Sequence, residues 1–73
     1  MPTADDVKIR IEAAIPGAQA AVDSADNVHF SARVVSPAFE GLSRIEQHRL
    51  VYAVFQGELG GDIHALQLKT ETP

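Results

Sequence analysis

Residues 28–35 alternate between two kinds of side chain at every step. One set is apolar and the other mostly polar, which is the period of a β-strand with one dry and one wet face. The dry set is Val28, Phe30, Ala32 and Val34, and the wet set is His29, Ser31, Arg33 and Val35. Such a strand needs cover on one face only, so other elements of the chain must pack against that face.

The N-terminal segment has the signals of an amphipathic helix. Thr3 stands three residues before Asp6, which is the spacing of an N-terminal capping box, and apolar residues then recur at helical intervals up to Ile15. The pattern predicts a helix over residues 4–15. Pro16 and Gly17 are expected to end it, because proline disfavours helical geometry in the preceding residue.

A second helix is predicted to begin at Ser43, which forms a complete S-x-x-E box with Glu46. We expect Gly60 and Gly61 to end it, since glycine takes a left-handed cap without strain. The resemblance of residues 57–60 to a phosphate-clamping G-x-x-G loop is weak, and the cap is the favoured interpretation. The predicted apolar stripe comprises Val51, Val54 and Phe55, widened by Ile45 and Leu50, while Arg44, Glu46, Gln47 and Arg49 are expected to face water.

Two more strands complete the expected pattern. Residues 18–23 predict a weak strand at an edge of the sheet, and residues 63–70 predict a final strand with His64, Leu66 and Leu68 on one face. The order helix, strand, strand, helix, strand predicts an α+β fold in which two helices cover one face of a three-stranded sheet. At 73 residues, the chain is expected to form one domain, residues 1–73.

The charge balance disfavours anionic partners. Six Lys and Arg against ten Asp and Glu give a net charge of −4, which repels phosphate backbones and anionic membrane surfaces. Nucleic-acid binding would therefore need a local basic patch, for which the candidates are Arg33, Arg44, Arg49 and Lys69. The N-terminus does not have the pattern of a secretory signal, and no apolar run approaches the roughly 20 residues of a membrane span. We expect a cytoplasmic protein without a membrane partner.

The chain has no cysteine and three histidines. It therefore has no disulfide and no thiolate nucleophile, and any soft-metal chemistry must take sulfur from a partner. Taken alone, His64 is most simply a partly buried histidine bonded to a backbone carbonyl, and His29 and His48 are most simply solvated. No two histidines have the spacing of a self-contained zinc site. No nucleophile or acid–base pair is evident, so we expect no enzyme activity.

From residue 28 to residue 73 the chain resembles the BolA family. The segments that carry the resemblance are His29-Phe30, Phe39-Glu40-Gly41, Gln47-His48-Arg49-Leu50-Val51-Tyr52, Ile63-His64-Ala65-Leu66 and Lys69-Thr70-Glu71-Thr72-Pro73. The resemblance implies an αββααβ fold related to class II KH domains. It also implies a short extra helix over residues 39–43.

The resemblance further implies a partner and a cofactor. Members of the family pair with monothiol, CGFS-type glutaredoxins, and the heterodimer holds a [2Fe-2S] cluster with ligands from the glutaredoxin cysteine, glutathione and the BolA chain. The family's best-supported histidine ligand corresponds to His64. The second family ligand lies in the loop before the middle strand, where this chain has neither Cys nor His in residues 24–27, so the nearest candidate is His29. The isolated chain is expected to hold no cluster and to be a monomer or weak homodimer.

Two functions follow from the resemblance. The first is an adaptor that pairs with a glutaredoxin in iron–sulfur cluster assembly, trafficking or iron sensing. The alternative is a DNA-binding transcriptional regulator of stress responses or morphology that uses the KH-like fold. The net charge of −4 favours the first.

Overall fold

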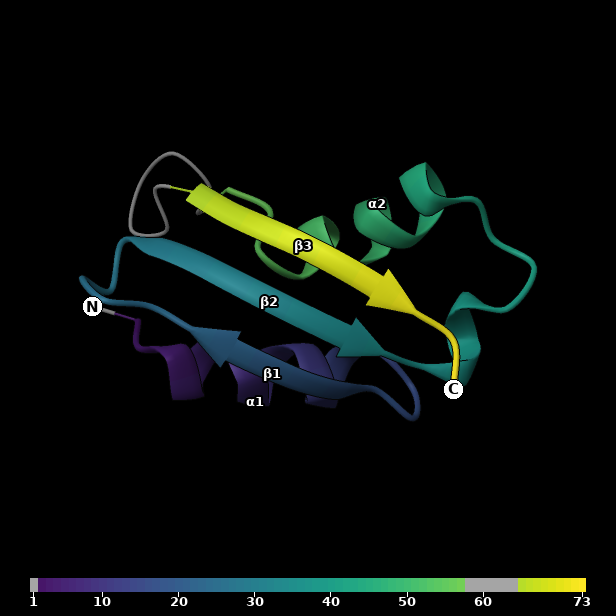
Figure 1. The fold of residues 1–73 in the computed structure, drawn as a ribbon, viewed down its shortest axis with the longest axis horizontal. Coiled ribbons are helices and arrows are strands. Elements are labelled where there is room, and N and C mark those ends of the chain that lie inside the picture. Colours follow the sequence, from purple (N-terminus) through teal and green to yellow (C-terminus); the bar gives the residue numbers. More distant parts are fainter. Residues whose placement is uncertain (1, 58–64) are drawn as a thin grey trace.

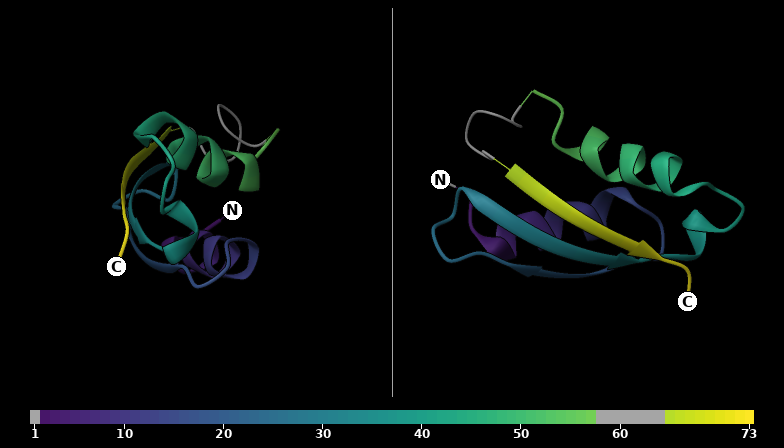
Figure 2. Two further views of the ribbon diagram at one scale, coloured as in Figure 1. Left: turned by 90° about the vertical axis from the view of Figure 1, so that its right-hand side faces the viewer. Right: turned by 45° about the horizontal axis from the view of Figure 1, so that its top comes forward.

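The chain forms a three-stranded sheet covered by two helices in a computed structural model, which describes residues 2–57 and 65–73. The elements are α1 (Ala4–Ala14), β1 (Gln19–Asp23), β2 (His29–Val35), the 3-10 helix η1 (Pro37–Phe39), α2 (Arg44–Val54) and β3 (Ala65–Glu71). In the sheet, β2 is central, with β1 antiparallel and β3 parallel to it (Figure 1). Both helices lie on one face of the sheet (Figure 2). The predicted α+β architecture, with an edge strand at residues 19–23, is confirmed.

The core lies between the inner face of the sheet and the two helices. Five of its side chains are at most 2% exposed: Phe30 and Val34 of β2, Phe39 of η1, Val51 of α2 and Phe55 at the end of α2. Each such side chain contributes about 1.5–3 kcal/mol by leaving water. The alternation of β2 is therefore the sheet's inside-and-outside pattern, as predicted, and it leaves His29 on the outer side.

Both predicted capping boxes are formed. The Asp6 amide donates to the Thr3 hydroxyl at 3.2 Å and the Thr3 amide donates to the Asp6 carboxylate at 2.9 Å. The corresponding bonds between Ser43 and Glu46 measure 3.2 and 3.0 Å. Because these bonds satisfy amides that a helix start leaves open, they fix where α1 and α2 begin.

The prediction that α2 extends to Gly60 and Gly61 is wrong: the helix ends at Val54, with Phe55 as its C-cap. Phe55 turns into the core, and the Arg10 guanidinium donates to the Val54 carbonyl at 3.1 Å. This long-range contact satisfies a carbonyl at the end of the helix. Gly57, three residues after Val54, adopts the positive φ (86°) that often follows a helix. Residues 60 and 61 lie outside the described residues, as does the predicted start of β3 at 63 and 64.

The predicted apolar stripe of α2 is partly wrong. Ile45 and Leu50 are 65% and 42% exposed, whereas Val51 and Phe55 are buried. The inner face of α2 follows an i, i+4, i+8 line through Gln47, Val51 and Phe55, so positions 45 and 50 fall outside it. Gln47 is accordingly half-buried rather than in water.

Gln47 joins three elements through its side chain. Its amide group donates to the carbonyls of Phe39 (3.3 Å) and Leu42 (3.0 Å), and its amide oxygen accepts the Thr70 hydroxyl at 2.7 Å. The side chain therefore ties the start of α2 to η1 and to β3.

The short extra helix lies at Pro37–Phe39, not over residues 39–43 as expected. Ser36 sets its position, because the buried hydroxyl accepts the Ala38 amide at 3.0 Å and donates to the Pro16 carbonyl at 2.7 Å. Phe39, the last residue of η1, is fully buried in the core. Among the helices of the described residues, none has the length and apolarity needed to cross a bilayer.

Candidate metal-ligand site at one end of the sheet

His29 is the first residue of β2, and its side chain is 60% exposed. The parallel register places it opposite Ala65, the first residue of β3, and the Ala65 amide donates to the Val28 carbonyl at 3.1 Å. The starts of β2 and β3 therefore lie side by side (Figure 1). His64, the predicted principal ligand, lies outside the described residues, directly before Ala65 in sequence.

The loop before β2 orients the His29 ring through Asp26. One carboxylate oxygen of Asp26 lies 2.7 Å from His29 Nδ1, and the other accepts the backbone amides of Val28 (3.0 Å) and His29 (2.9 Å). The pKa of Asp26 is held well below its ordinary value, first by the His29 amide, then by the His29 ring and the Val28 amide. Asp26 is therefore a carboxylate at neutral pH.

The Ser24 hydroxyl also stabilises this loop, through two hydrogen bonds to the backbone. The hydroxyl donates to the His29 carbonyl at 2.6 Å and accepts the Asn27 amide at 2.9 Å. Asn27 adopts a φ of 61°, a conformation that Asn tolerates better than most residues. The loop is thus built by its own side chains, and it holds both the backbone and the ring of His29.

A carboxylate on Nδ1 favours the tautomer that carries its proton there and a lone pair on Nε2. That is the form in which imidazole binds a metal, and metal-binding histidines commonly have such a carboxylate partner. The exposed ring of His29 and its Asp26 partner therefore fit a ligand to a metal centre whose other ligands come from outside. Within residues 2–57 and 65–73, no three His, Asp or Glu side chains gather to hold a metal by themselves.

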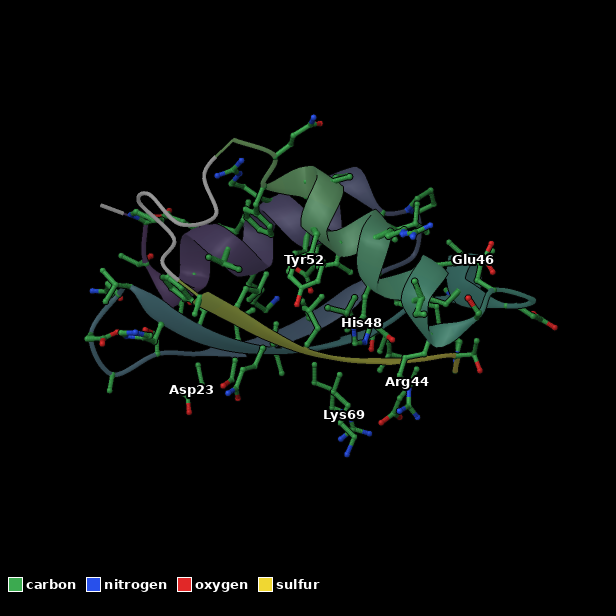
Figure 3. The ribbon with its side chains drawn as sticks, turned by 90° about the horizontal axis from the view of Figure 1, so that it is seen from above. Asp23, Arg44, Glu46, His48, Tyr52 and Lys69 are labelled. Carbon is green, nitrogen blue, oxygen red and sulfur yellow. The ribbon has the colours of Figure 1, made fainter. Side chains whose placement is uncertain are left out.

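His48 occupies a different place. It is half-buried on α2, its ring meets the Tyr52 ring edge-on at a centroid distance of 6.3 Å, and it lines a cleft with Lys69 of β3. Figure 3 shows His48 and Tyr52 on the side of α2 that faces β3.

The four basic candidates are only partly gathered. Arg33 and Lys69 are register partners on β2 and β3, and Arg33 pairs with the Glu71 carboxylate at 3.0 Å. Arg44 lines the same cleft as Lys69. Arg49 is also exposed, but it lies five residues beyond Arg44 and therefore roughly 140° further round the axis of α2.

The sequence did not identify Asp26 and Ser24 as site residues. The stretch from Ser24 to Asn27 indicated only a turn. A signal was nevertheless present, because Asp26 precedes His29 by three residues and Ser and Asp side chains readily bond nearby amides.

The described parts define a small α+β domain whose parallel β2–β3 pair is joined through η1 and α2, with an exposed, carboxylate-paired histidine at the sheet's end and no thiol. A family model described as BolA-like protein matches residues 6–73, so the chain belongs to the BolA-like family.

Similar proteins agree with this assignment. BolA-like protein 1 of Homo sapiens is 49% identical over 53 residues, which cover 73% of this chain and 39% of that protein. The chain thus spans well under half the length of this relative. The structure of a BolA protein homologue from Coxiella burnetii superposes with a TM-score of 0.85 at 40% identity, covering 100% of this chain and 94% of that one. The BolA domain of SufE1 from Arabidopsis thaliana gives 0.83 at 29% identity, covering 96% and 91%.

Proposed function

We propose that this chain is an adaptor that pairs with a monothiol, CGFS-type glutaredoxin in iron–sulfur cluster assembly, trafficking or iron sensing. In the complex, the two proteins and glutathione share a [2Fe-2S] cluster. This chain contributes the imidazole of His64, and His29 is the candidate for a second ligand.

The observation that carries the proposal is the carboxylate-paired imidazole at the start of β2. His29 is exposed, Asp26 holds its ring at 2.7 Å, and its register partner Ala65 is the residue that follows His64. His29 therefore lies opposite the residue that directly follows His64 in the sequence. This end of the sheet suits a centre that is completed by a second protein.

The absence of cysteine sets the division of ligands. Because this chain has no thiol, the thiolates must come from the glutaredoxin cysteine and from glutathione. A bound cluster would supply one-electron redox chemistry, and a neutral imidazole in place of a thiolate raises its potential. The chain's own residues present the imidazole, and Asp26 fixes the tautomer of His29.

An adaptor role also agrees with how BolA domains occur in other proteins. SufE-like protein 1 of Arabidopsis thaliana contains a BolA domain as one part of a longer chain, in which the matched region is 12% of the length. In that protein, a BolA domain is therefore one part of a longer chain.

The proposal is tested by anaerobic reconstitution of the chain with a monothiol glutaredoxin and glutathione. We expect a heterodimer in size-exclusion chromatography and a visible circular dichroism spectrum that differs from that of the glutaredoxin alone. His64→Ala should abolish the mixed spectrum, and the matched control His48→Ala should leave it unchanged. No heterodimer in any state would refute the adaptor function, and a spectrum unchanged by His64→Ala would refute the ligand assignment alone.

A further inference from the structure

Among residues 2–57 and 65–73, one side of the β3 backbone faces no other strand. The Ala65 amide donates to β2 and the Glu71 carbonyl accepts from the Ser36 amide, so residues 65, 67, 69 and 71 direct their polar groups toward β2. In a parallel pair, the intervening residues Leu66, Leu68 and Thr70 then direct theirs to the open side. β3 is accordingly an edge strand with a row of amides and carbonyls available to a partner.

Tyr52 marks one end of this open row. Its hydroxyl donates to the Leu66 carbonyl at 3.0 Å. Across the described parts of the chain, no loop or helix donates to or accepts from the main-chain groups of Leu68 and Thr70. The stretch that can accept a further strand is therefore the C-terminal half of β3.

A cleft of about 440 Å³ runs beside that half of the strand. It is lined by Arg44 and His48 from α2 and by residues 68–71 of β3. Arg44, His48 and Tyr52 follow one another at i, i+4 and i+8 on the side of α2 that faces β3 (Figure 3). A strand added to β3 would thus lie between the β3 edge and this line of side chains.

The charge of the cleft is opposite to that of the whole chain. Arg44 and Lys69 are cations, and the Glu71 carboxylate in the cleft is paired with Arg33 at 3.0 Å. The chain as a whole carries −4. A local cationic site on an anionic protein attracts carboxylates to one place and repels them elsewhere.

We propose that the open edge of β3, with Arg44 and Lys69, binds an extended acidic segment of a partner protein as an added β-strand. Main-chain bonds to Leu68 and Thr70 supply the pairing, as in other β-augmentation complexes. Side chains alternate along a strand, so one carboxylate of the segment meets Lys69 on the open face and the next faces Arg44 and His48.

Two other occupants fit the observations less well. Nucleic-acid phosphates accept hydrogen bonds but do not donate them, so a phosphate backbone does not match a strand edge that offers N–H and C=O groups in turn. A second copy of the chain, paired β3 to β3, would bring two cationic clefts together.

This surface is distinct from the proposed cluster site. Leu68 is three residues beyond Ala65, or roughly 10 Å along the strand. The proposal depends on no metal and no glutaredoxin, so its outcome is independent of the function proposed above.

The test is an NMR titration of the isotope-labelled chain with an acetylated, amidated octapeptide of sequence Thr-Glu-Glu-Thr-Thr-Glu-Glu-Thr, in which neighbouring glutamates lie on opposite faces of a strand. We expect amide shift changes centred on Leu68, Lys69 and Thr70 and slower hydrogen exchange of the Leu68 and Thr70 amides. Peptides methylated on every second backbone nitrogen separate strand pairing from simple attraction. One alternation should abolish binding, and the other should retain it.

Matched variants report on the charges. Arg44→Glu combined with Lys69→Glu should weaken binding by roughly tenfold or more, and each single variant should do so in part. Arg49→Glu, on another side of α2, should change it little, and the backbone spectrum of each variant reports whether the fold is kept. Several results would overturn the proposal: no change at Leu68 and Thr70, equal binding of a Lys-Thr octapeptide, equal loss in Arg49→Glu, binding of an eight-nucleotide oligothymidylate instead of the peptide, or concentration-dependent dimerisation through the same amides.

Discussion

Nδ1 of the His29 ring lies 2.7 Å from one carboxylate oxygen of Asp26, and the other oxygen of the same carboxylate accepts the backbone amide of His29. One side chain therefore fixes both the start of β2 and the orientation of the imidazole. This contact links the fold to the proposed chemistry, because the loop that connects β1 to β2 also orients the imidazole ring of His29.

Asp26→Asn should reverse the tautomer of His29. An amide nitrogen facing Nδ1 would donate where the carboxylate accepts, so the ring proton should move to Nε2. The ring nitrogen shifts in long-range ¹H–¹⁵N spectra measure this directly. The matched control is Asp23→Asn, since the Asp23 carboxylate borders the loop and accepts the Ser24 amide at 3.1 Å, whereas Nδ1 of the His29 ring faces Asp26. The same tautomer in Asp26→Asn as in the parent would contradict the assigned role.

Stability should fall in acid. The pKa of Asp26 is lowered from 3.8 by the His29 amide and ring, and the pKa of Glu46 is lowered from 4.5 by the Ser43 amide and hydroxyl. As the pH falls, these carboxylates therefore take up protons at a higher pH in the unfolded chain than in the folded chain. The free energy of unfolding should keep its full value above about pH 5 and should decrease as the pH falls toward the lowered pKa values of the folded chain. Urea midpoints measured from neutral pH to about pH 3 check this, and Asp26→Asn should flatten the profile. A midpoint independent of pH in this range would be inconsistent with these carboxylate bonds.

Ser36→Ala should destabilise the fold by about 1–3 kcal/mol. The hydroxyl is buried, and its loss leaves the Pro16 carbonyl and the Ala38 amide without their partner. Chemical denaturation gives the free energy of unfolding. Ser31→Ala, on the exposed face of β2, is the control and should change it by less than about 0.5 kcal/mol. Equal effects of the two substitutions would show that the Ser36 bonds do not hold the turn and η1 together.

Gln47 and Thr70 should show energetic coupling. The Thr70 hydroxyl donates to the Gln47 amide oxygen at 2.7 Å and links β3 to α2. A double-mutant cycle with Gln47→Leu and Thr70→Val should give a coupling energy of about 0.5–1.5 kcal/mol. Additive effects would argue against the bond in solution.

Local signals predicted most of the fold. Both helix starts follow from capping boxes that depend on residues three apart, and the faces of β2 follow from strict alternation. The end of α2 does not follow from local signals, because Phe55 turns into the core there and the Val54 carbonyl accepts from Arg10, which is 44 residues away in sequence. The exposed positions of Ile45 and Leu50 also could not be predicted, since hydropathy does not reveal which line of a helix will meet the sheet.

The candidate site was predictable only in part. Alternation placed His29 on the wet face of β2, and the resemblance to the BolA family indicated His64. The pairing of His29 with Asp26 needed the shape of the loop, which depends on Ser24 and on the positive φ of Asn27. Parallel register, which places Ala65 beside His29, is a long-range property that no local motif specifies.

The most direct measurement of the central claim is pulsed electron paramagnetic resonance on the reduced, mixed cluster formed with a monothiol glutaredoxin and glutathione. With the chain's histidines labelled with ¹⁵N, we predict a strong hyperfine coupling from a directly bound imidazole nitrogen, retained in His48→Ala and lost in His64→Ala. A spectrum without coordinated nitrogen, or one unchanged by His64→Ala, would contradict the proposal that this chain completes the cluster through His64.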